Sequence, residues 1–182
     1  MKPAAERTLV QLAIATRDGE FVARYSVNGL AGLAFPAKRP ATSTVALKGL
    51  PMTIRRWHRA TTIALKRALA GRIPRVLPPL DLHAGTAFQQ RVWRALLEIP
   101  RGQTRSYGEI ARAIRSSRAA RAVGNACGDN PIPVLIPCHR VVAEHGKLGG
   151  FSGGLEWKRR LLWREEVRDW WSVPPAGEPG SD

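Results

Sequence analysis

Apolar and polar positions alternate along the first part of the chain. The segments Leu9–Thr16 and Glu20–Val27 carry apolar side chains at every second position, which is the pattern of half-buried strands. Arg17-Asp18-Gly19 between them predicts a hairpin turn, and Asn28-Gly29 leads into a further short strand over Leu30–Phe35. We therefore expect a small antiparallel sheet.

Helical spacing replaces this alternation further along the chain. After the loop Pro36–Pro51, the pattern predicts a helix over Met52–Ala70 that ends at Gly71. The proline-rich stretch Arg72–Pro79 follows and predicts a connector. A domain boundary is expected here, which leaves a β-rich amino-terminal domain in residues 1-80.

Two capping signatures divide the next part into short helices. Thr86-Ala-Phe-Gln89 and Ser106-Tyr-Gly-Glu109 each place Gln or Glu three positions after a hydroxyl residue, a pattern that opens helices. A third helix is expected after Arg115-Ser116-Ser117, and a last one over Leu155–Val167. The third helix is expected to bury Ala119, Ala122, Val123, Ala126 and Cys127. Two short helices joined by a tight polar turn have the layout of a helix-turn-helix.

Together these elements predict a fold of the α+β class. The second domain is expected over residues 81-171, as a helical domain with a helix-turn-helix and an active-site turn. From Ser172 the chain holds mainly proline, glycine, serine and acidic residues. That composition predicts a disordered tail at 172-182.

The chain is strongly basic, which bears on its partners. It has 29 Lys and Arg against 14 Asp and Glu, and a formal net charge of +15. Such a surplus favours DNA, RNA or an acidic membrane surface, although arginine spread over a solvated surface would give the same count. No apolar run approaches the ~18 residues of a membrane span.

Cysteine usage indicates a reducing compartment. Two cysteines are too few for a disulfide framework. Lys2 and Arg7 precede the apolar stretch Leu9–Ala15, but this stretch is short and contains Gln11, so we interpret it as the first strand and not as a signal peptide. A cytoplasmic protein with reduced thiols is expected.

Two sites stand out chemically. On the third helix, Arg118, Arg121 and Asn125 share the face opposite the apolar stripe. This face is either the DNA-binding side of a recognition helix or an ordinary solvated face. Cys138 and His139 follow Pro137, and a histidine beside a thiol can take its proton if the chain turns there. Alternatively, Cys138 is a buried structural cysteine. We interpret Cys127 as a small residue of the core.

Seven motifs in this order resemble the O6-alkylguanine-DNA alkyltransferase family, the methylated-DNA–protein-cysteine methyltransferases. The resemblance covers about Thr86 to Glu166, and the proline-cysteine-histidine-arginine core is its most specific part. The motifs are Phe88-Gln-Gln-Arg-Val-Trp93, Ser106-Tyr-Gly-Glu109, Arg121-Ala-Val-Gly124, Asn130-Pro131, Ile136-Pro-Cys-His-Arg-Val141, Gly149-Gly-Phe-Ser-Gly-Gly154 and Leu161-Leu162 before Glu165.

The resemblance implies direct DNA repair in a single turnover. The alkyl group of O6-alkylguanine, with O4-alkylthymine as a further candidate, would pass to Cys138. His139 would take the thiol proton, relayed through a water to Glu165. Arg121 would enter the duplex in place of the flipped nucleotide, and Tyr107 would push the 3′ phosphate and help to protonate the departing guanine.

The resemblance also implies a pocket for the flipped base. Asn130 matches the hinge that joins the recognition helix to the active-site turn, and Ser152 would donate a hydrogen bond to the guanine oxygen. The backbone carbonyls of Cys138 and Val141 would read the exocyclic amine of the base. Pro133 and Phe151 complete the expected pocket, with Phe151 where many relatives have tyrosine.

The implied partner is double-stranded DNA containing O6-alkylguanine, bound by a monomer that needs no cofactor. Some relatives bind zinc in the amino-terminal domain. That segment here has no cysteine and only His58, with His83 just beyond it, so no metal is expected.

Two other functions stay open at this point. Alkyltransferase-like proteins bind alkyl lesions without catalysis and lack the acceptor cysteine, so Cys138 argues against that function. A cysteine hydrolase using Cys138 and His139 would turn over, and would usually bring its histidine from a distant part of the sequence.

Overall fold

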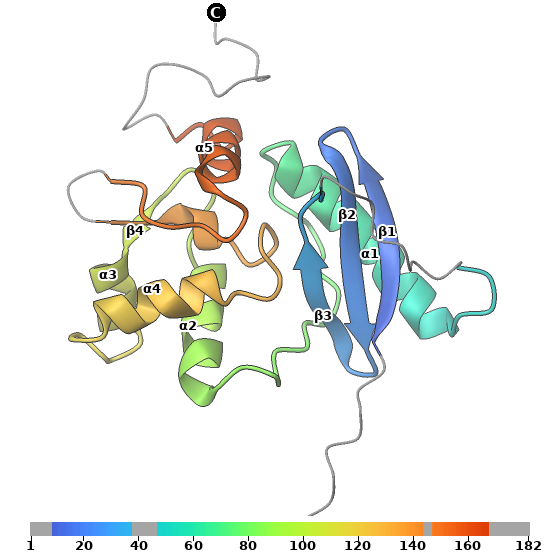
Figure 1. Ribbon diagram of the computed structural model, residues 1–182, viewed down its shortest axis with the longest axis horizontal. Coiled ribbons are helices and arrows are strands. Elements are labelled where there is room, and N and C mark those ends of the chain that lie inside the picture. Colours follow the sequence, from blue (N-terminus) through green and yellow to red (C-terminus); the bar gives the residue numbers. More distant parts are fainter. Residues whose placement is uncertain (1–8, 38–46, 144–146, 168–182) are drawn as a thin grey trace, which may run out of the picture.

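A computed structural model describes residues 9–37, 47–143 and 147–167 of the chain. The tail predicted for 172-182 lies outside these residues. Figure 1 shows two halves side by side: a sheet with one long helix, and a group of shorter helices. The predicted α+β class is confirmed.

The first half is a three-stranded antiparallel sheet covered by one helix. Strands β1 (Val10–Thr16), β2 (Gly19–Ser26) and β3 (Gly29–Ala34) pair in chain order, and α1 (Met52–Leu69) packs against them. The alternation of apolar and polar positions is confirmed in β1 and β2. The inward side chains are all buried: Leu12, Ile14, Phe21, Ala23 and Tyr25. Both predicted turns and the predicted helix are therefore confirmed to within a few residues.

The second half consists of short helices and one small parallel ladder. Its elements are α2 (Ala87–Leu97), β4 (Arg105–Ser106), α3 (Tyr107–Ala113), α4 (Ala120–Gly128), the 3₁₀ turn η1 (Cys138–Arg140), β5 (Val141–Val142) and α5 (Leu155–Arg164). Both capping boxes form: Thr86 and Ser106 accept the backbone N–H of Gln89 and Glu109, and each partner side chain returns a bond. The parallel pairing of β4 with β5 was not predicted.

Three local predictions were wrong. The last helix ends at Arg164 and not at Val167, because Glu166 has a positive φ of 64° that breaks the helical path. Arg118 lies in the turn before α4 and is not on that helix. Ala122 is exposed, so the buried side of α4 consists of Val123, Ala126 and Cys127.

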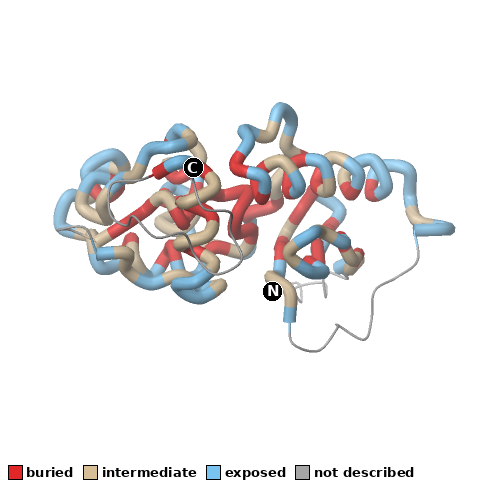
Figure 2. Tube along the Cα trace, turned by 90° about the horizontal axis from the view of Figure 1, so that it is seen from above, coloured by how far each residue is buried: buried red, intermediate tan, exposed pale blue. Residues whose placement is uncertain are grey.

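The two halves share one hydrophobic core. Figure 2 shows buried segments meeting where the halves join, and a single buried cluster includes side chains from the sheet, α1 and the second half. Phe35, directly after β3, contacts Phe21, Phe151 and Trp157, with ring centroids 5.0–5.7 Å apart. The Leu33 backbone N–H donates to the Pro131 carbonyl at 2.8 Å, so β3 also touches the segment that leads to Cys138.

Candidate active site

The segment from Asn130 to Cys138 is a tight, buried turn built on one asparagine. The Asn130 side-chain oxygen accepts the Ile132 N–H at 3.0 Å, which orients the amide. Its NH₂ group donates to the Ile136 carbonyl at 2.8 Å and to the Cys138 Sγ at 3.0 Å. Val134 has a φ of 74°, which is rare for a β-branched residue. Asn130 therefore holds both the shape of the turn and the sulfur atom.

The Cys138 thiol is buried and chemically restrained. Only 2% of the residue is exposed, and burial raises the pKa of the thiol to about 11. The Asn130 hydrogen bond, the charge of Lys158 and two backbone N–H groups act in the opposite direction. Each of these stabilises a thiolate once the proton has left, but a base is needed to remove it.

His139, the next residue in the chain, is the candidate for that base. The chain turns at Pro137 into η1, as the Cys-His interpretation required. His139 Nε2 lies 3.1 Å from Glu165 Oε1, a direct contact, so the predicted water between these two residues is wrong. Burial lowers the pKa of His139, although Glu165 works against this. The imidazole is therefore neutral at physiological pH and able to accept a proton.

The other imidazole nitrogen is available for that proton. Within the described residues, His139 Nδ1 is buried and has no hydrogen-bond partner. Because Nε2 faces a carboxylate, it carries the hydrogen, and Nδ1 is left as the acceptor. An unpaired buried acceptor on the residue that follows the thiol is the state expected of a base before it takes a proton.

Glu165 is held in its ionised form by two partners. Burial alone would raise its pKa, but the hydrogen bonds and charges of His139 and Arg140 outweigh burial and lower the pKa to about 2. Arg140 binds both carboxylate oxygens, at 2.8 and 2.9 Å, and also donates to the Ile99 carbonyl at 2.6 Å. The fixed carboxylate can therefore stabilise an imidazolium on His139.

Lys158 is a site residue that the sequence interpretation missed. It is 0% exposed, and its Nζ donates to the carbonyls of Val141 (2.6 Å), Leu148 and Gly150 (3.3 Å). Burial lowers the pKa of its ammonium group to about 8. Its spacing from Leu161 and Leu162 was the available signal, because residues three and four apart share a helix face. Lys158 therefore connects the glycine-rich loop to β5, and one of its hydrogen bonds uses the Val141 carbonyl that was expected to read the base.

Tyr107 closes the same site from α3. Its ring packs against Gly149, where a side chain would collide with the hydroxyl group, and the Gly150 backbone N–H donates to its oxygen. Burial raises the pKa of this hydroxyl, so it remains a proton donor at neutral pH. The structure thus brings Tyr107, Cys138, His139 and Glu165 into one neighbourhood.

The expected pocket residues are distributed around this centre. Pro133 is buried in the active-site turn, and Val141 is buried in β5. Phe151 is half-buried and packs edge-on against Phe35, the residue after β3, and Ser152 is exposed. The role of each toward a base stays a prediction.

The expected DNA-binding residues lie on one exposed surface. Arg121 and Asn125 are exposed on α4, and Arg118 is exposed in the turn that precedes it. The opposite side of α4 is pinned by Trp93, whose indole N–H donates to the Ala126 carbonyl at 2.8 Å. The helix-turn-helix layout predicted for α3 and α4 is present, with its arginines directed away from the core.

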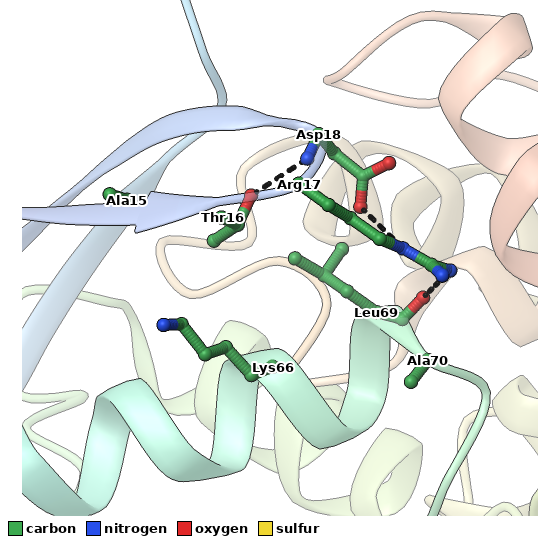
Figure 3. Close-up of a pocket in the computed structure, with 7 residues that line it drawn as sticks. All are labelled: Ala15, Thr16, Arg17, Asp18, Lys66, Leu69 and Ala70. Atoms are coloured by element: carbon green, nitrogen blue, oxygen red, sulfur yellow. Dashed lines mark hydrogen bonds and ion pairs between the residues drawn. The ribbon is translucent and has the colours of Figure 1, made fainter.

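Within the described ranges, no group of three or more His, Cys, Asp or Glu side chains could hold a metal ion. In that same part of the chain, no helix is both long enough and apolar enough to span a bilayer. The cavity drawn in Figure 3, about 490 Å³, lies between the β1–β2 turn and the end of α1, away from Cys138.

Comparison with known proteins gives this site a family. Residues 87–167 match the family described as 6-O-methylguanine DNA methyltransferase, DNA binding domain. A methylated-DNA–protein-cysteine methyltransferase of Mycobacterium tuberculosis is 55% identical over 104 residues. These residues are 57% of this chain and 62% of that relative, so the match spans somewhat less than two thirds of the relative's length.

Solved structures extend the likeness to both halves of the molecule. The chain resembles Mycobacterium tuberculosis OGT, solved in complex with DNA, with a TM-score of 0.68 and 39% identity. That match covers 91% of this chain and 95% of the other. The O6-methylguanine-DNA methyltransferase of Pyrococcus kodakaraensis has a TM-score of 0.60 at 26% identity, covering 88% of this chain and 100% of the other. The chain therefore belongs to the O6-methylguanine-DNA methyltransferase family.

Proposed function

We propose that the chain repairs DNA by transferring the alkyl group of O6-alkylguanine to Cys138, once per molecule. One observation carries the proposal: a buried thiol is bound by Asn130, and the histidine next to it is held at Nε2 by Glu165 while Nδ1 is unpaired. This arrangement can make a thiolate where the free thiol would remain protonated.

The transfer balances with the groups present. The Cys138 thiol gives its proton to His139 Nδ1, directly or through one water, and Glu165 stabilises the imidazolium that results. The sulfur then attacks the alkyl carbon, an S–C bond forms and the C–O6 bond breaks. The electron pair of that bond goes to the guanine, which leaves as a neutral base after accepting a proton. Tyr107 is the nearby donor for that proton.

The same chemistry explains why each molecule would react only once. The product on Cys138 is a thioether, which is a poor leaving group in water. No step draws on a cofactor, because the protein itself is the acceptor. The proposed class is therefore a single-turnover methylated-DNA–[protein]-cysteine S-methyltransferase.

Double-stranded DNA is the proposed partner. The relative solved with DNA supports this, as do the net charge of +15 and the exposed surface formed by Arg118, Arg121 and Asn125. The alkyl carbon is buried in the base stack, so the nucleotide must be extruded at a cost of a few kcal/mol. Arg121 is the side chain we assign to fill the vacated space.

The monomeric state, the cytoplasmic location and the domain limits of 1-80 and 81-171 remain part of this proposal. Both cysteines are unpaired, and the reaction needs a reduced thiol, which supports a reducing compartment.

The decisive experiment is intact-mass spectrometry with excess duplex DNA containing O6-methylguanine. The protein should gain one methyl group, ~14 Da, and stop at one equivalent because the thiol has been consumed. A non-catalytic lesion binder would gain no mass, and a cysteine hydrolase would continue past one equivalent. Either result would contradict the proposal.

A further inference from the structure

An ion pair joins the two halves of the molecule next to the active site. Arg164, at the end of α5, donates to both carboxylate oxygens of Asp18 in the β1–β2 turn, at 2.7 and 2.8 Å. The two residues are 146 positions apart, and their side chains are only 8% and 6% exposed. A bidentate pair at this depth is a fixed contact, unlike an exposed surface pair.

The surroundings of the pair come from both halves. Arg164 also donates to the Leu69 carbonyl at 2.8 Å, and Arg17 donates to the same carbonyl at 3.4 Å. Figure 3 shows Arg17 and Asp18 in the β1–β2 turn above Leu69 at the end of α1, and Figure 1 shows α5 near this end of α1. Arg101 in turn bonds the Arg164 carbonyl, at 3.4 Å. The carboxyl end of α5 is thus held by its side chain and by its backbone.

The residue that follows Arg164 is the one that orients the base. Glu165 caps α5, with its N–H bonded to Leu161 and Leu162, and its carboxylate contacts His139. The helical path ends there, because Glu166 has a positive φ. Glu165 is therefore the C-cap of α5. Because Arg164 directly precedes it, the Asp18–Arg164 ion pair fixes the backbone from which the Glu165 side chain projects.

We propose that Asp18 is a positioning residue for alkyl transfer: by holding Arg164 it fixes Glu165, and through Glu165 the imidazole of His139. The inference rests on the proposed function and adds to it a contribution from the amino-terminal half. Arg140 alone does not replace this contact, because it fixes the Glu165 carboxylate but not the end of the helix.

The test uses Asp18→Asn and the full chain reacting with free O6-benzylguanine. The variant keeps the volume of the side chain but leaves the Arg164 charge without a carboxylate. Because each molecule reacts once, the amplitude of the reaction counts folded protein and the rate constant measures the chemistry. We expect an unchanged amplitude and a rate constant lower by about tenfold, the scale expected for a small misplacement of a catalytic group.

The pH dependence separates positioning from folding. The difference in rate constant between Asp18→Asn and the wild type should become smaller at alkaline pH, because hydroxide then removes the thiol proton without His139. A loss of structure would reduce the amplitude at every pH. The matched control is Ser26→Ala, which removes a buried hydrogen bond to Asp81, another contact between the sheet and the segment after α1. It should lower stability and leave the rate constant unchanged.

A second comparison asks whether Asp18 acts through Glu165. In a Glu165→Gln background, Asp18→Asn should change the rate by less than about twofold, because the group it positions is already disabled. Asp18→Glu, which keeps the charge, should restore much of the rate. If Asp18→Asn reacts at the wild-type rate, or loses as much in the Glu165→Gln background as alone, the inference is wrong and the proposed function stands. A wild-type chain that transfers nothing to Cys138 overturns both.

Discussion

The two cysteines of this chain are both buried, yet only one has the surroundings of a nucleophile. Cys127 lies on the inner side of α4 and Cys138 in the active-site turn, with exposed fractions of 7% and 2%. Burial raises the pKa of both thiols, to about 12 and about 11. A sulfur atom in a protein interior is therefore unreactive by default.

The neighbours make the difference. Cys138 receives a hydrogen bond from Asn130 and is followed by His139, which Glu165 orients. Lys158 favours both thiolates by charge, so its presence alone does not distinguish them. We therefore expect the reactivity of Cys138 to come from the neighbouring donor and base, and not from access to solvent.

The largest expected effect tests the comparison directly. Cys138→Ala should gain no mass from O6-methylguanine DNA, whereas Cys127→Ala should gain one methyl group at close to the wild-type rate. Peptide mapping after the reaction checks this. Methyl label on Cys127, or transfer by Cys138→Ala, would reverse the assignment. Binding of Cys138→Ala to DNA should persist, because the exposed arginines are unchanged.

The next effect concerns the base. His139→Ala and Glu165→Gln should each slow transfer by about 10²–10³-fold, the usual contribution of a positioned general base, because Cys138 would lose its proton acceptor. The double variant should be little slower than the single ones, since the two residues act as a unit. Single-turnover kinetics with O6-benzylguanine measure this. Additive losses would mean that Glu165 serves only to cap α5.

The dependence of stability on acid pH should also distinguish the surroundings of Cys138 from those of Cys127. The pKa of Glu165 is lowered in the folded state, so its contribution is present above about pH 4.5 and is lost as the pH falls through about 2. The shift corresponds to roughly 3 kcal/mol. In Glu165→Gln, the free energy of unfolding should therefore decrease less between about pH 4.5 and 2 than in the wild type. Urea titrations at several pH values measure this. Cys127→Ala, as the control, should shift the whole curve without changing its slope.

The smallest effect concerns how the substrate reaches Cys138. Arg121→Ala should reduce repair of duplex DNA by about tenfold, because the exposed arginine supports extrusion of the nucleotide. Reaction with free O6-benzylguanine should stay unchanged, since no duplex is opened. Affinity for unmodified duplex should fall steeply with salt in both proteins. An equal loss on both substrates would argue against the role of Arg121.

Local signals in the sequence predicted much of the fold and part of the site. The hairpin at Arg17-Asp18-Gly19 and both capping boxes depend on residues within a few positions of each other, and all formed as expected. The turn at Pro137 was predictable for the same reason, because a Cys-His pair cannot converge in a plain strand. The predicted roles of these residues in the reaction remain to be tested.

Contacts over long separations could not be predicted. The spacing of Lys158 from Leu161 and Leu162 indicates a shared helix face, but it does not identify the three carbonyls that Lys158 binds, because only the folded loop brings them to it. The Asp18–Arg164 pair joins a hairpin turn to the last helix, and no local pattern marks it. The two-residue strands β4 and β5 are too short to leave an alternation in the sequence.

The connector between the halves has a consequence for how the molecule comes apart. Ile73 and Val76 on it are largely exposed, so the covalent link itself is weakly packed, while the hydrophobic core runs from one half into the other. Neither half would then be complete as a separate unit, because each leaves apolar surface that the other covers. Heating should melt sheet and helices in one cooperative transition, and a chain nicked in the connector should hold together until that temperature.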